Sequence, residues 1–428
     1  MNTNNPSNVF GLLLPEIGRA VSDAGYETPT PIQEQSIPAL LEGRDMIGCA
    51  QTGTGKTAAF TLPILQLLVK NKKHPISRKP KVLILAPTRE LAAQIRDSVD
   101  KYGKHTQISH TVIFGGVGQN PQVKALKRGV HVLVATPGRL IDLISQKHID
   151  LTSVEIFVLD EADRMLDMGF IHDIKRVIAK LPKKRQSLFY SATMEPKVVE
   201  LARTLVDNPV YVTITPNEPT VDRIDQKVMF VAKGDKDKLI IDLLRSEKMN
   251  RVMVFVQMKH VANKVAGKLE AVGITAAAIH GNKSQGARTA ALADFKAGRV
   301  RVLVATDIAA RGIDVDNVSH VINYELPNEP ETYIHRIGRT ARAGSDGDAI
   351  SFCCAPERNY LRAIENLLKT TIPTDLKHTL HCEASMNATG ADAKPAPKAQ
   401  RGRGRTPSRS NGPRKQSYGT RQRRGRRG

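Results

Sequence analysis

The sequence predicts an α/β protein made of two lobes in tandem, each built on a parallel β-sheet. Its 428 residues exceed what one hydrophobic core usually organises, so two domains are expected. Short apolar runs rich in β-branched residues alternate with stretches of helical period, and this alternation occurs in both halves of the chain. Strands that are apolar throughout are typical of parallel sheets covered by helices on both faces.

Ten apolar runs mark the expected strands. In the first half of the chain they lie at residues 46–50, 82–86, 132–136, 156–160 and 188–191. In the second half they lie at residues 252–256, 274–279, 302–306, 321–324 and 349–353. Because helical patterns follow the strands in both sets, the two halves predict two sheets of the same kind.

Prolines and changes in composition indicate the domain boundaries. Pro209, Pro216 and Pro219 interrupt a stretch with little periodicity, which is typical of a linker. The expected divisions are lobe 1 at residues 1–212, a linker at 213–222, lobe 2 at 223–373, and an extension with a tail at 374–428. Residues 401–428 are rich in Arg and Gly and cannot bury a core, so this basic tail is expected to be disordered.

The chain is strongly basic, with a formal net charge of +22. Residues 391–428 hold 13 Lys or Arg and one acid, which leaves +10 for the first 390 residues. A folded part that is still basic, together with a basic tail, indicates a polyanionic partner such as a nucleic acid. The competing explanation for the excess of Lys and Arg is that these residues only keep the protein soluble. Trp is absent and aromatic residues make up only 4%, which argues against an aromatic-rich ligand groove.

The cysteines and the N-terminal residues indicate the cellular setting. Four cysteines show neither CxxC spacing nor histidines at zinc-finger distances, which favours a reducing compartment without disulfides or structural zinc. The N-terminus lacks the pattern of a secretory signal, and no stretch reaches the ~18 apolar residues of a spanning helix. We therefore expect a soluble cytoplasmic protein without a membrane partner.

A phosphate-binding loop is expected between the first strand and the helix after it. The sequence AQTGTGKT follows a strand and opens a helix that should run to about Lys70, which is the context of a P-loop. Its glycines let backbone N–H groups approach phosphate oxygens, and the helix N-terminus adds positive charge. Lys56 is expected to reach the β- and γ-phosphates, and the Thr57 hydroxyl to bind Mg²⁺. The nucleotide-binding residues of the loop are Ala50, Gln51, Thr52, Gly53, Thr54, Gly55, Lys56 and Thr57.

An acidic pair follows the apolar run at residues 154–159. Asp160 and Glu161 stand at the carboxyl end of this strand, where open α/β sheets bind their ligands. Asp160 is expected to hold Mg²⁺, and Glu161 to polarise the attacking water. The pair could equally cap the next helix if it is considered alone. The phosphate loop upstream favours the interpretation of the pair as a metal site over the interpretation as a helix cap.

A cationic helical face is expected in the second half of the chain. Pro330 suits the first turn of a helix and Gly344 its end. Steps of four and three residues would place His335, Arg339 and Arg342 on one face. In a two-lobed nucleoside triphosphatase such arginines are candidates for stabilising the γ-phosphate held by the other lobe. A solvated basic face is the alternative.

The sequence Asp160-Glu-Ala-Asp163, together with further motifs in order along the chain, resembles the DEAD-box helicase family. Residues 25–33, which read GYETPTPIQ, resemble the adenine-reading Q motif, with Phe10 as its upstream aromatic. The other first-lobe motifs are PTREL at 87–91, GG at 115–116, TPGR at 136–139 and SAT at 191–193. The second-lobe motifs are VFV at 254–256, His280-Gly281 with Gln285 and Arg288, and the segments 305–314 and 335–342. The resemblance covers residues 10–372 and implies that both lobes are RecA-like.

The resemblance implies a role for each of these residues. Tyr26 would stack on adenine with Phe10 nearby, and Gln33 would hydrogen-bond the edge of the base, which makes ATP the nucleotide. Ser191 and Thr193 would couple hydrolysis to strand separation, and Gly312 and Asp314 would close over the nucleotide. The RNA-contacting residues would be Thr88, Arg89, Gly116, Thr136 and Arg139 in lobe 1, and Gly281, Arg288 and Thr306 in lobe 2.

The function implied is that of an RNA-dependent ATPase, an ATP-dependent RNA helicase that clamps RNA and locally unwinds short duplexes or remodels ribonucleoproteins. Two alternatives are a DNA translocase of the same superfamily, which the residues alone do not exclude, and a non-enzymatic RNA-binding scaffold. A scaffold would be expected to have lost Lys56, Asp160, Glu161 or Arg342, and all four are intact.

The compact organisation and the basic tail look like the RhlE-type bacterial branch of the family. This branch implies ribosome assembly, RNA decay or cold adaptation as the setting, with ribosomal or RNA-decay assemblies as partners. The tail resembles Arg/Gly-rich segments that bind RNA with low sequence preference, so it is expected to assist RNA binding.

Overall fold

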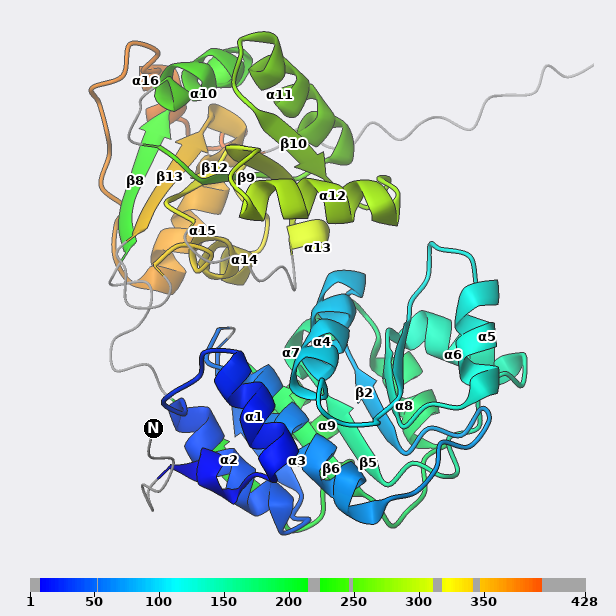
Figure 1. Cartoon of the computed structure of the whole chain (residues 1–428). Coiled ribbons are helices and arrows are strands. Elements are labelled where there is room, and N and C mark those ends of the chain that lie inside the picture. The colour runs from blue at the N-terminus through cyan, green and yellow to red at the C-terminus, as the bar shows by residue number, and fades with distance from the viewer. Residues whose placement is uncertain are drawn as a thin grey trace, which may run out of the picture. The chain divides into compact units, whose positions relative to one another are not determined.

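The computed structural model describes residues 8–51, 53–214, 224–245, 249–310, 318–341 and 347–394 (Figure 1). Within them the chain forms two α/β units, each a parallel sheet with helices on both faces, as the apolar runs predict. No helix among these residues combines the length and the apolar character that crossing a bilayer requires.

The first sheet has seven strands in the order β3-β4-β2-β5-β6-β1-β7, and every pair within it is parallel. The strands are β1 (Met46–Cys49), β2 (Val82–Leu85), β3 (His110–Ile113), β4 (Val132–Ala135), β5 (Ile156–Leu159), β6 (Gln186–Ser191) and β7 (Val210–Thr213). The helices are η1 (Val9–Leu12), α1 (Pro15–Asp23), α2 (Pro31–Leu41), α3 (Lys56–Asn71), α4 (Arg89–Tyr102), α5 (Asn120–Arg128), α6 (Pro137–Ser145), α7 (Ala162–Asp167), α8 (Ile171–Ile178) and α9 (Pro196–Arg203).

Alternate side chains of the central strands enter two separate cores. In β2, Val82 and Ile84 pack into one apolar cluster, whereas Leu83 and Leu85 pack into the cluster on the other face. All four side chains are fully buried. This two-sided burial explains why the strand reads as a continuous apolar run.

The second sheet has six strands in the order β10-β11-β9-β12-β13-β8, again all parallel. The strands are β8 (Ile224–Phe230), β9 (Val252–Val256), β10 (Ala276–Ile279), β11 (Val302–Thr306), β12 (His320–Asn323) and β13 (Gly347–Cys353). The helices are η3 (Lys233–Asp235), α10 (Lys236–Leu244), α11 (Lys259–Ala271), α12 (Gln285–Lys296), α13 (Asp307–Ala310), α14 (Pro330–Ile337), η4 (Ala355–Glu357), α15 (Arg358–Leu368) and α16 (Glu383–Met386).

All ten predicted strands are present, and three further strands have no counterpart in the prediction. These three, β3, β7 and β8, each lie at an edge of a sheet. Their side chains are not uniformly buried: Tyr211 of β7 is 67% exposed, and β8 contains the polar sequence Asp225-Gln226-Lys227 after its first residue. An edge strand needs no continuous apolar run, so the pattern that identifies central strands misses it.

The second lobe continues to pack beyond Pro373. The Asp375 N–H donates to the Val228 carbonyl at 2.9 Å, and the Cys382 N–H donates to the Phe230 carbonyl at 3.0 Å, so this segment lies along β8. Ala393 is fully buried, and its carbonyl accepts a hydrogen bond from the Asn359 N–H. The predicted linker lies outside the described residues except for residues 213 and 214, as does the tail from residue 395.

Candidate functional site

The predicted site residues of the first lobe gather at one edge of its sheet. The phosphate loop follows β1, Thr88 follows β2, Thr136 follows β4, Asp160 follows β5, and Ser191 ends β6. Because all these strands are parallel, their carboxyl ends share one edge, which is where ligands bind in open α/β sheets.

The phosphate loop has the backbone conformation that glycine allows. Gly53 and Gly55 have φ of 88° and 94°, and α3 begins directly after Gly55. A Cβ on Gly55 would lie 2.6 Å from the Gln33 amide nitrogen, so a side chain there would also collide with α2. The Lys56 ammonium is buried and donates to the Ala50 carbonyl at 2.7 Å, which holds it inside the loop. Thr52 lies outside the described residues.

Gln33 connects the Q motif to the phosphate loop. Its Oε1 accepts a hydrogen bond from the Thr30 N–H at 3.0 Å, and its Nε2 donates to the Gly55 carbonyl at 3.3 Å. The first bond belongs to the capping box of α2, which fixes the amide at the helix N-terminus. The residue predicted to read adenine therefore also contacts the loop predicted to bind phosphate.

The predicted adenine aromatics lie on the surface of the first lobe. Tyr26 is 39% exposed, and its hydroxyl is 3.1 Å from that of Tyr102 at the end of α4. The Lys101 ammonium stands 5.0 Å from the centre of the Tyr26 ring. Phe10 lies in η1 and is partly buried against the core. Sequence patterns gave no signal for Lys101 or Tyr102.

Asp160 is almost completely buried at the end of β5. Its Oδ1 has no hydrogen-bond partner among the residues that the structure describes. Burial raises the pKa of this carboxyl well above its usual range, and the nearby Lys56 ammonium opposes the shift. A buried, unpartnered carboxylate oxygen fits a hard cation or its bound water. No group of three His, Cys, Asp or Glu in the described part of the chain suits a metal held by protein alone.

Glu161 makes a buried ion pair instead of capping the next helix. It precedes α7 in the left-handed region, with φ of 54°, and makes no side-chain capping bond. Its carboxylate lies 2.9 Å from the Arg164 guanidinium, and both side chains are buried. The geometry therefore does not support the interpretation that the acidic pair caps the next helix through a side-chain hydrogen bond. Arg164 was not singled out by the sequence, because a lone arginine is ordinarily a surface residue.

Asp163 joins the acidic motif to the end of β6. Its Oδ2 accepts hydrogen bonds from the N–H groups of Ala192 and Thr193, both at 3.0 Å, and from the Thr193 hydroxyl at 3.4 Å. Ser191 is fully buried, and its hydroxyl has no partner among the described residues. The last residue of the acidic motif thus fixes the backbone of the predicted coupling motif.

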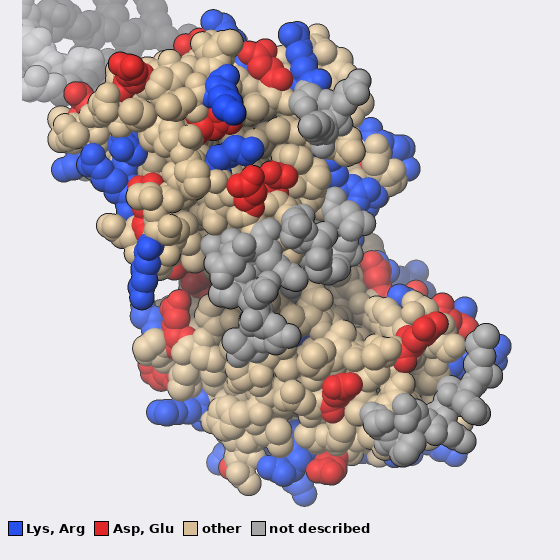
Figure 2. Space-filling view, turned by 90° about the vertical axis from the view of Figure 1, so that its left-hand side faces the viewer, with Lys and Arg blue, Asp and Glu red and all other residues tan. Residues whose placement is uncertain are grey.

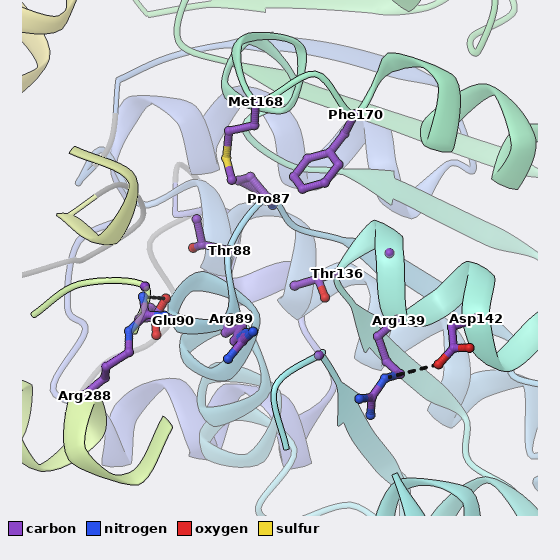
Figure 3. A pocket seen from close by; sticks show the side chains of 13 residues that line it. Pro87, Thr88, Arg89, Glu90, Thr136, Arg139, Asp142, Met168, Phe170 and Arg288 are labelled. Carbon is purple, nitrogen blue, oxygen red and sulfur yellow. Dashed lines mark ion pairs between the residues drawn. The ribbon is translucent and has the colours of Figure 1, made fainter. Parts of the chain in front are cut away.

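A cationic pocket of roughly 450 Å³ lies at the same edge (Figure 3). Six of the eight predicted RNA contacts line it: Thr88, Arg89, Thr136, Arg139, Gly281 and Arg288. Burial lowers the pKa of Arg89 from its ordinary value, and neighbouring Arg288 and Arg139 act in the same direction. Its three arginines outnumber its two acids, Glu90 and Asp142, and a net positive charge in a hollow suits phosphate groups. Thr306, at the end of β11, does not line the pocket.

The pocket also contains residues that the sequence analysis did not assign. Glu90 pairs with the Arg288 guanidinium at 2.8 Å, and both side chains are buried. Met168 and Phe170 supply an apolar wall (Figure 3).

Gly116 has φ of 74°, and a Cβ built on it would overlap the Arg89 guanidinium. This glycine therefore makes room for the arginine.

The predicted helix of the second lobe ends earlier than expected. Helix α14 begins at Pro330 as predicted, but it ends at Ile337 and not near Gly344. Gly338 caps it, and beyond it the Thr340 hydroxyl donates to the Val318 carbonyl at 2.6 Å, so the chain leaves the helical path. The helical face expected to carry both His335 and Arg339 is therefore wrong, because Arg339 lies beyond the end of the helix. His335 and Arg339 nevertheless line one small hollow. Arg342, Gly312 and Asp314 lie outside the described residues.

Arg336 is the buried arginine of this segment. Its guanidinium contacts the Asp307 carboxylate at 2.6 and 2.8 Å and donates to the Glu325 carbonyl at 2.6 Å. It also lies 5.2 Å from the centre of the Phe255 ring. Arg336 is 1% exposed and lines the same small hollow as His335 and Arg339, held in place by these contacts.

Family models match both lobes. The model of the DEAD/DEAH box helicase matches residues 30–201, and that of the helicase conserved C-terminal domain matches residues 235–344. The chain therefore belongs to the DEAD-box helicase family.

Curated relatives agree with this assignment. The chain is 42% identical over 359 residues to the ATP-dependent RNA helicase DeaD of Mycobacterium tuberculosis, an alignment that covers 84% of this chain and 62% of that protein. It is 41% identical over 363 residues to the ATP-dependent RNA helicase RhlB of Actinobacillus succinogenes, which covers 84% of this chain and 88% of that protein.

Solved structures share the fold. The Saccharomyces cerevisiae Dbp5 bound to RNA and ADP BeF3 matches with a TM-score of 0.74 and 36% identity, over 86% of this chain and 96% of that one. The DEAD-box helicase Mss116 bound to ssRNA and UDP-BeF matches with a TM-score of 0.76 and 30% identity, over 85% of this chain and 78% of that one.

We predict that Gly116→Ala weakens RNA binding by roughly tenfold, because its Cβ displaces Arg89 and one charge-assisted phosphate contact is lost. Fluorescence anisotropy with a labelled single-stranded RNA measures the affinity. Gly118→Ala is the matched control, since a Cβ on Gly118 meets nothing within 4 Å. ATP affinity should stay unchanged in both variants. Equal RNA affinity of the two variants would contradict the prediction.

Proposed function

We propose that this chain is an ATP-dependent RNA helicase: an RNA-dependent ATPase that grips one strand by its phosphates and separates short duplexes or remodels ribonucleoproteins. The observation that carries the proposal is the shared edge of the first sheet. The phosphate loop, the acidic motif and the cationic pocket all lie at the carboxyl ends of its strands. A nucleotide and a polyanion bound there can influence each other through direct contacts.

In this proposal the first lobe binds ATP. The loop from Ala50 to Thr57 holds the phosphates with Lys56, while Tyr26, Phe10 and Gln33 hold adenine. Asp160 and the Thr57 hydroxyl are the residues that would hold Mg²⁺, since both offer oxygen ligands and a buried oxygen of Asp160 has no partner in the described part of the chain. Bound there, the ion would neutralise charge on the phosphates.

The hydrolytic step would use groups from both lobes. Glu161 would orient and polarise the attacking water, and its ion pair with Arg164 holds the carboxylate in place. His335, Arg339 and Arg342 would stabilise negative charge developing on the γ-phosphate, with Gly312 and Asp314 closing over the nucleotide. Catalysis would then require the lobes to close on ATP and RNA together.

RNA would be held mainly through its backbone. The proposed contacts are Thr88, Arg89, Gly116, Thr136, Arg139, Gly281, Arg288 and Thr306. Contacts to phosphate carry little sequence information and make binding strongly dependent on salt. Ser191 and Thr193, fixed by Asp163, would transmit hydrolysis to this grip.

Within the family we place the chain in the RhlE-type branch, acting in the cytoplasm on ribosome assembly, RNA decay or cold adaptation. The Arg/Gly-rich sequence at 401–428 supports this choice. Identities of 41–42% to proteins named DeaD, CshA and RhlB do not separate the branches. Proteins bound to this chain in its host, recovered after crosslinking, would separate ribosomal from RNA-decay partners.

The proposed function is tested by ATP hydrolysis with two polymers of the same sequence. We expect single-stranded RNA to stimulate phosphate release by at least tenfold, and single-stranded DNA to stimulate it little, because the family acts on RNA. Strand separation should be limited to short duplexes. Equal stimulation by DNA, or processive unwinding of long duplexes, would favour a DNA translocase instead.

Arg339→Ala should bind ATP with nearly normal affinity and lose RNA-stimulated turnover by about 10³-fold, because a charge that stabilises the γ-phosphate is removed. Single-turnover phosphate release with saturating RNA gives the rate, and binding of a fluorescent ATP analogue reports that the site is intact. Arg362→Ala, at an exposed position on α15, is the control. Unchanged turnover of Arg339→Ala would reject the assignment.

Removal of residues 395–428 should weaken RNA binding by about tenfold at low salt and leave the basal ATPase intact, because the segment holds 12 Lys or Arg and no acid. The cut belongs after Lys394, since the buried Ala393 still packs on lobe 2. A Gly/Ser segment of the same length serves as the control for length. Equal RNA affinity with and without the native tail would show that the tail only solvates the protein.

A further inference from the structure

The amino-terminal edge of the first sheet carries a concentration of positive charge that the proposed site does not use. Four segments precede four adjacent strands: residues 70–81 before β2, 124–131 before β4, 147–155 before β5 and 180–185 before β6. These strands lie side by side in the order β4-β2-β5-β6 and are all parallel. The four segments, which we call the basic edge, therefore lie together, opposite the edge that carries the phosphate loop.

The basic edge accounts for the excess charge of the folded chain. It holds 14 Lys or Arg and only two acids, Asp150 and Glu155, and thus carries a charge of +12. The first 390 residues as a whole carry +10, so the remainder of that region is slightly acidic. The face in Figure 2 shows the usual pattern, with Lys and Arg interspersed with Asp and Glu. General solvation therefore does not explain the basic edge.

Most of these cations face solvent. The exposed ones are Lys70, Lys72, Lys73, Arg78, Lys124, Lys127, Arg128, Lys147, Lys180, Lys183 and Lys184. The two acids are already engaged: Glu155 pairs with Lys73 and Lys81 at 2.8 and 3.0 Å, and Asp150 pairs with Lys79 at 3.1 Å. Among the described residues, no acid forms an ion pair with any other member of the basic edge.

A pocket of roughly 440 Å³ lies within the basic edge. Arg78, Lys79, Lys147 and Lys180 line it, together with Ser77, Thr152 and one acid, Asp150, whose carboxylate pairs with Lys79 and accepts a hydrogen bond from the Thr152 hydroxyl. Cations and hydroxyl groups are the donors that phosphate oxygens accept. The pocket thus has the chemistry of an anion site.

Backbone contacts hold the segments around this pocket together. The Arg78 N–H donates to the Leu126 carbonyl at 2.8 Å, and the Arg78 carbonyl accepts from the Asp150 N–H at 2.9 Å. Arg78 and Lys147 have φ of 62° and 58°, a region that costs non-glycine residues energy. The cations of the segments 70–81, 124–131 and 147–155 therefore stand on loops that are fixed to one another before any ligand binds.

We propose that the basic edge binds a second segment of RNA, beyond the strand held at the proposed site, through its phosphate backbone. This inference rests on RNA being the substrate. Four strands about 4.8 Å apart span roughly 15 Å, which is enough for several consecutive phosphates. The four segments contain no Phe, Tyr or Trp, so the contacts expected are mainly to phosphate, which carries little sequence information.

RNA fits the basic edge better than an anionic membrane. Membrane-surface binding uses a broad apolar face beside the positive charge. Among the large apolar side chains of the basic edge, Ile76 alone is exposed in the structure as described. The surface thus offers charge without an apolar anchor.

The test compares two RNAs on charge-reversal variants of the full chain. One RNA is a single strand of about 10 nucleotides, enough for the proposed site alone, and the other carries the same strand joined to a duplex of about 20 base pairs. The variants are Lys180→Glu/Lys183→Glu and Lys127→Glu/Arg128→Glu, at two different segments. The matched control is Arg19→Glu/Arg362→Glu, which makes the same change in net charge at exposed positions elsewhere.

For the longer RNA, each basic-edge variant should lose affinity on the order of tenfold, and the slope of log affinity against log salt should fall by about 2. Affinity for the short strand, and ATP hydrolysis stimulated by it, should match the control. Crosslinking of the longer RNA should label residues 180–185 in the unmodified chain.

Three outcomes would overturn the proposal. The first is a loss of affinity for the longer RNA no larger than that of the control, and the second is an equal loss for the short strand. The third is a loss of binding to phosphatidylglycerol vesicles with RNA affinity unchanged, which would assign the surface to lipid. Failure of the proposed function would be seen separately, as absence of RNA-stimulated ATP hydrolysis in the unmodified chain.

Discussion

Parallel pairing of every strand is the constraint on which the rest of this molecule depends. A parallel sheet sends all of its carboxyl ends to one edge and all of its amino ends to the other, so residues far apart in sequence meet without long loops. In the first lobe, one edge gathers the phosphate loop, the acidic motif and the cationic pocket. The opposite edge gathers the four basic segments. One topological rule thus separates two surfaces of different chemistry.

Direct contacts link neighbouring motifs at the carboxyl edge. Gln33 bonds to the Gly55 carbonyl, and Asp163 bonds to the backbone of Ala192 and Thr193. Each link uses a side chain of one motif and the main chain of another, so neither motif can shift alone without losing a buried or partly buried bond. This arrangement is suited to a protein in which nucleotide state and RNA grip must change together.

Sequence patterns were sufficient for the central strands and for the residues brought together at the carboxyl edge. Val82–Leu85 and Val252–Val256 are buried on both faces, and two-sided burial leaves a continuous apolar run that is easily read. The edge strand β8 is apolar only at Ile224 and over Val228–Phe230, and the polar residues 225–227 interrupt its run. The prediction that this helix reaches Gly344 is wrong. Side-chain periodicity does not register the cap at Gly338, nor the hydrogen bond by which the Thr340 hydroxyl holds the chain off the helical path.

Among the site residues, spacing and motif order located Lys56, Asp160 and Arg89, but not their partners. Arg164, Arg336 and Glu90 are charged residues whose importance comes from burial beside an opposite charge. A sequence without its structure gives no measure of that burial. The basic edge was hidden for a related reason, because its 14 cations come from four separate segments and only the strand order brings them together.

The segment that runs along β8 has a consequence for how this chain can be divided. An edge strand with unpaired N–H and C=O groups is a template on which another chain can add. In the intact protein, hydrogen bonds from Asp375 and Cys382 occupy that side of β8. A second lobe cut at Pro373 would expose the strand and should be prone to self-association, even though all its helicase motifs are present. The residues that cover this edge of the lobe therefore lie beyond the last motif of its family.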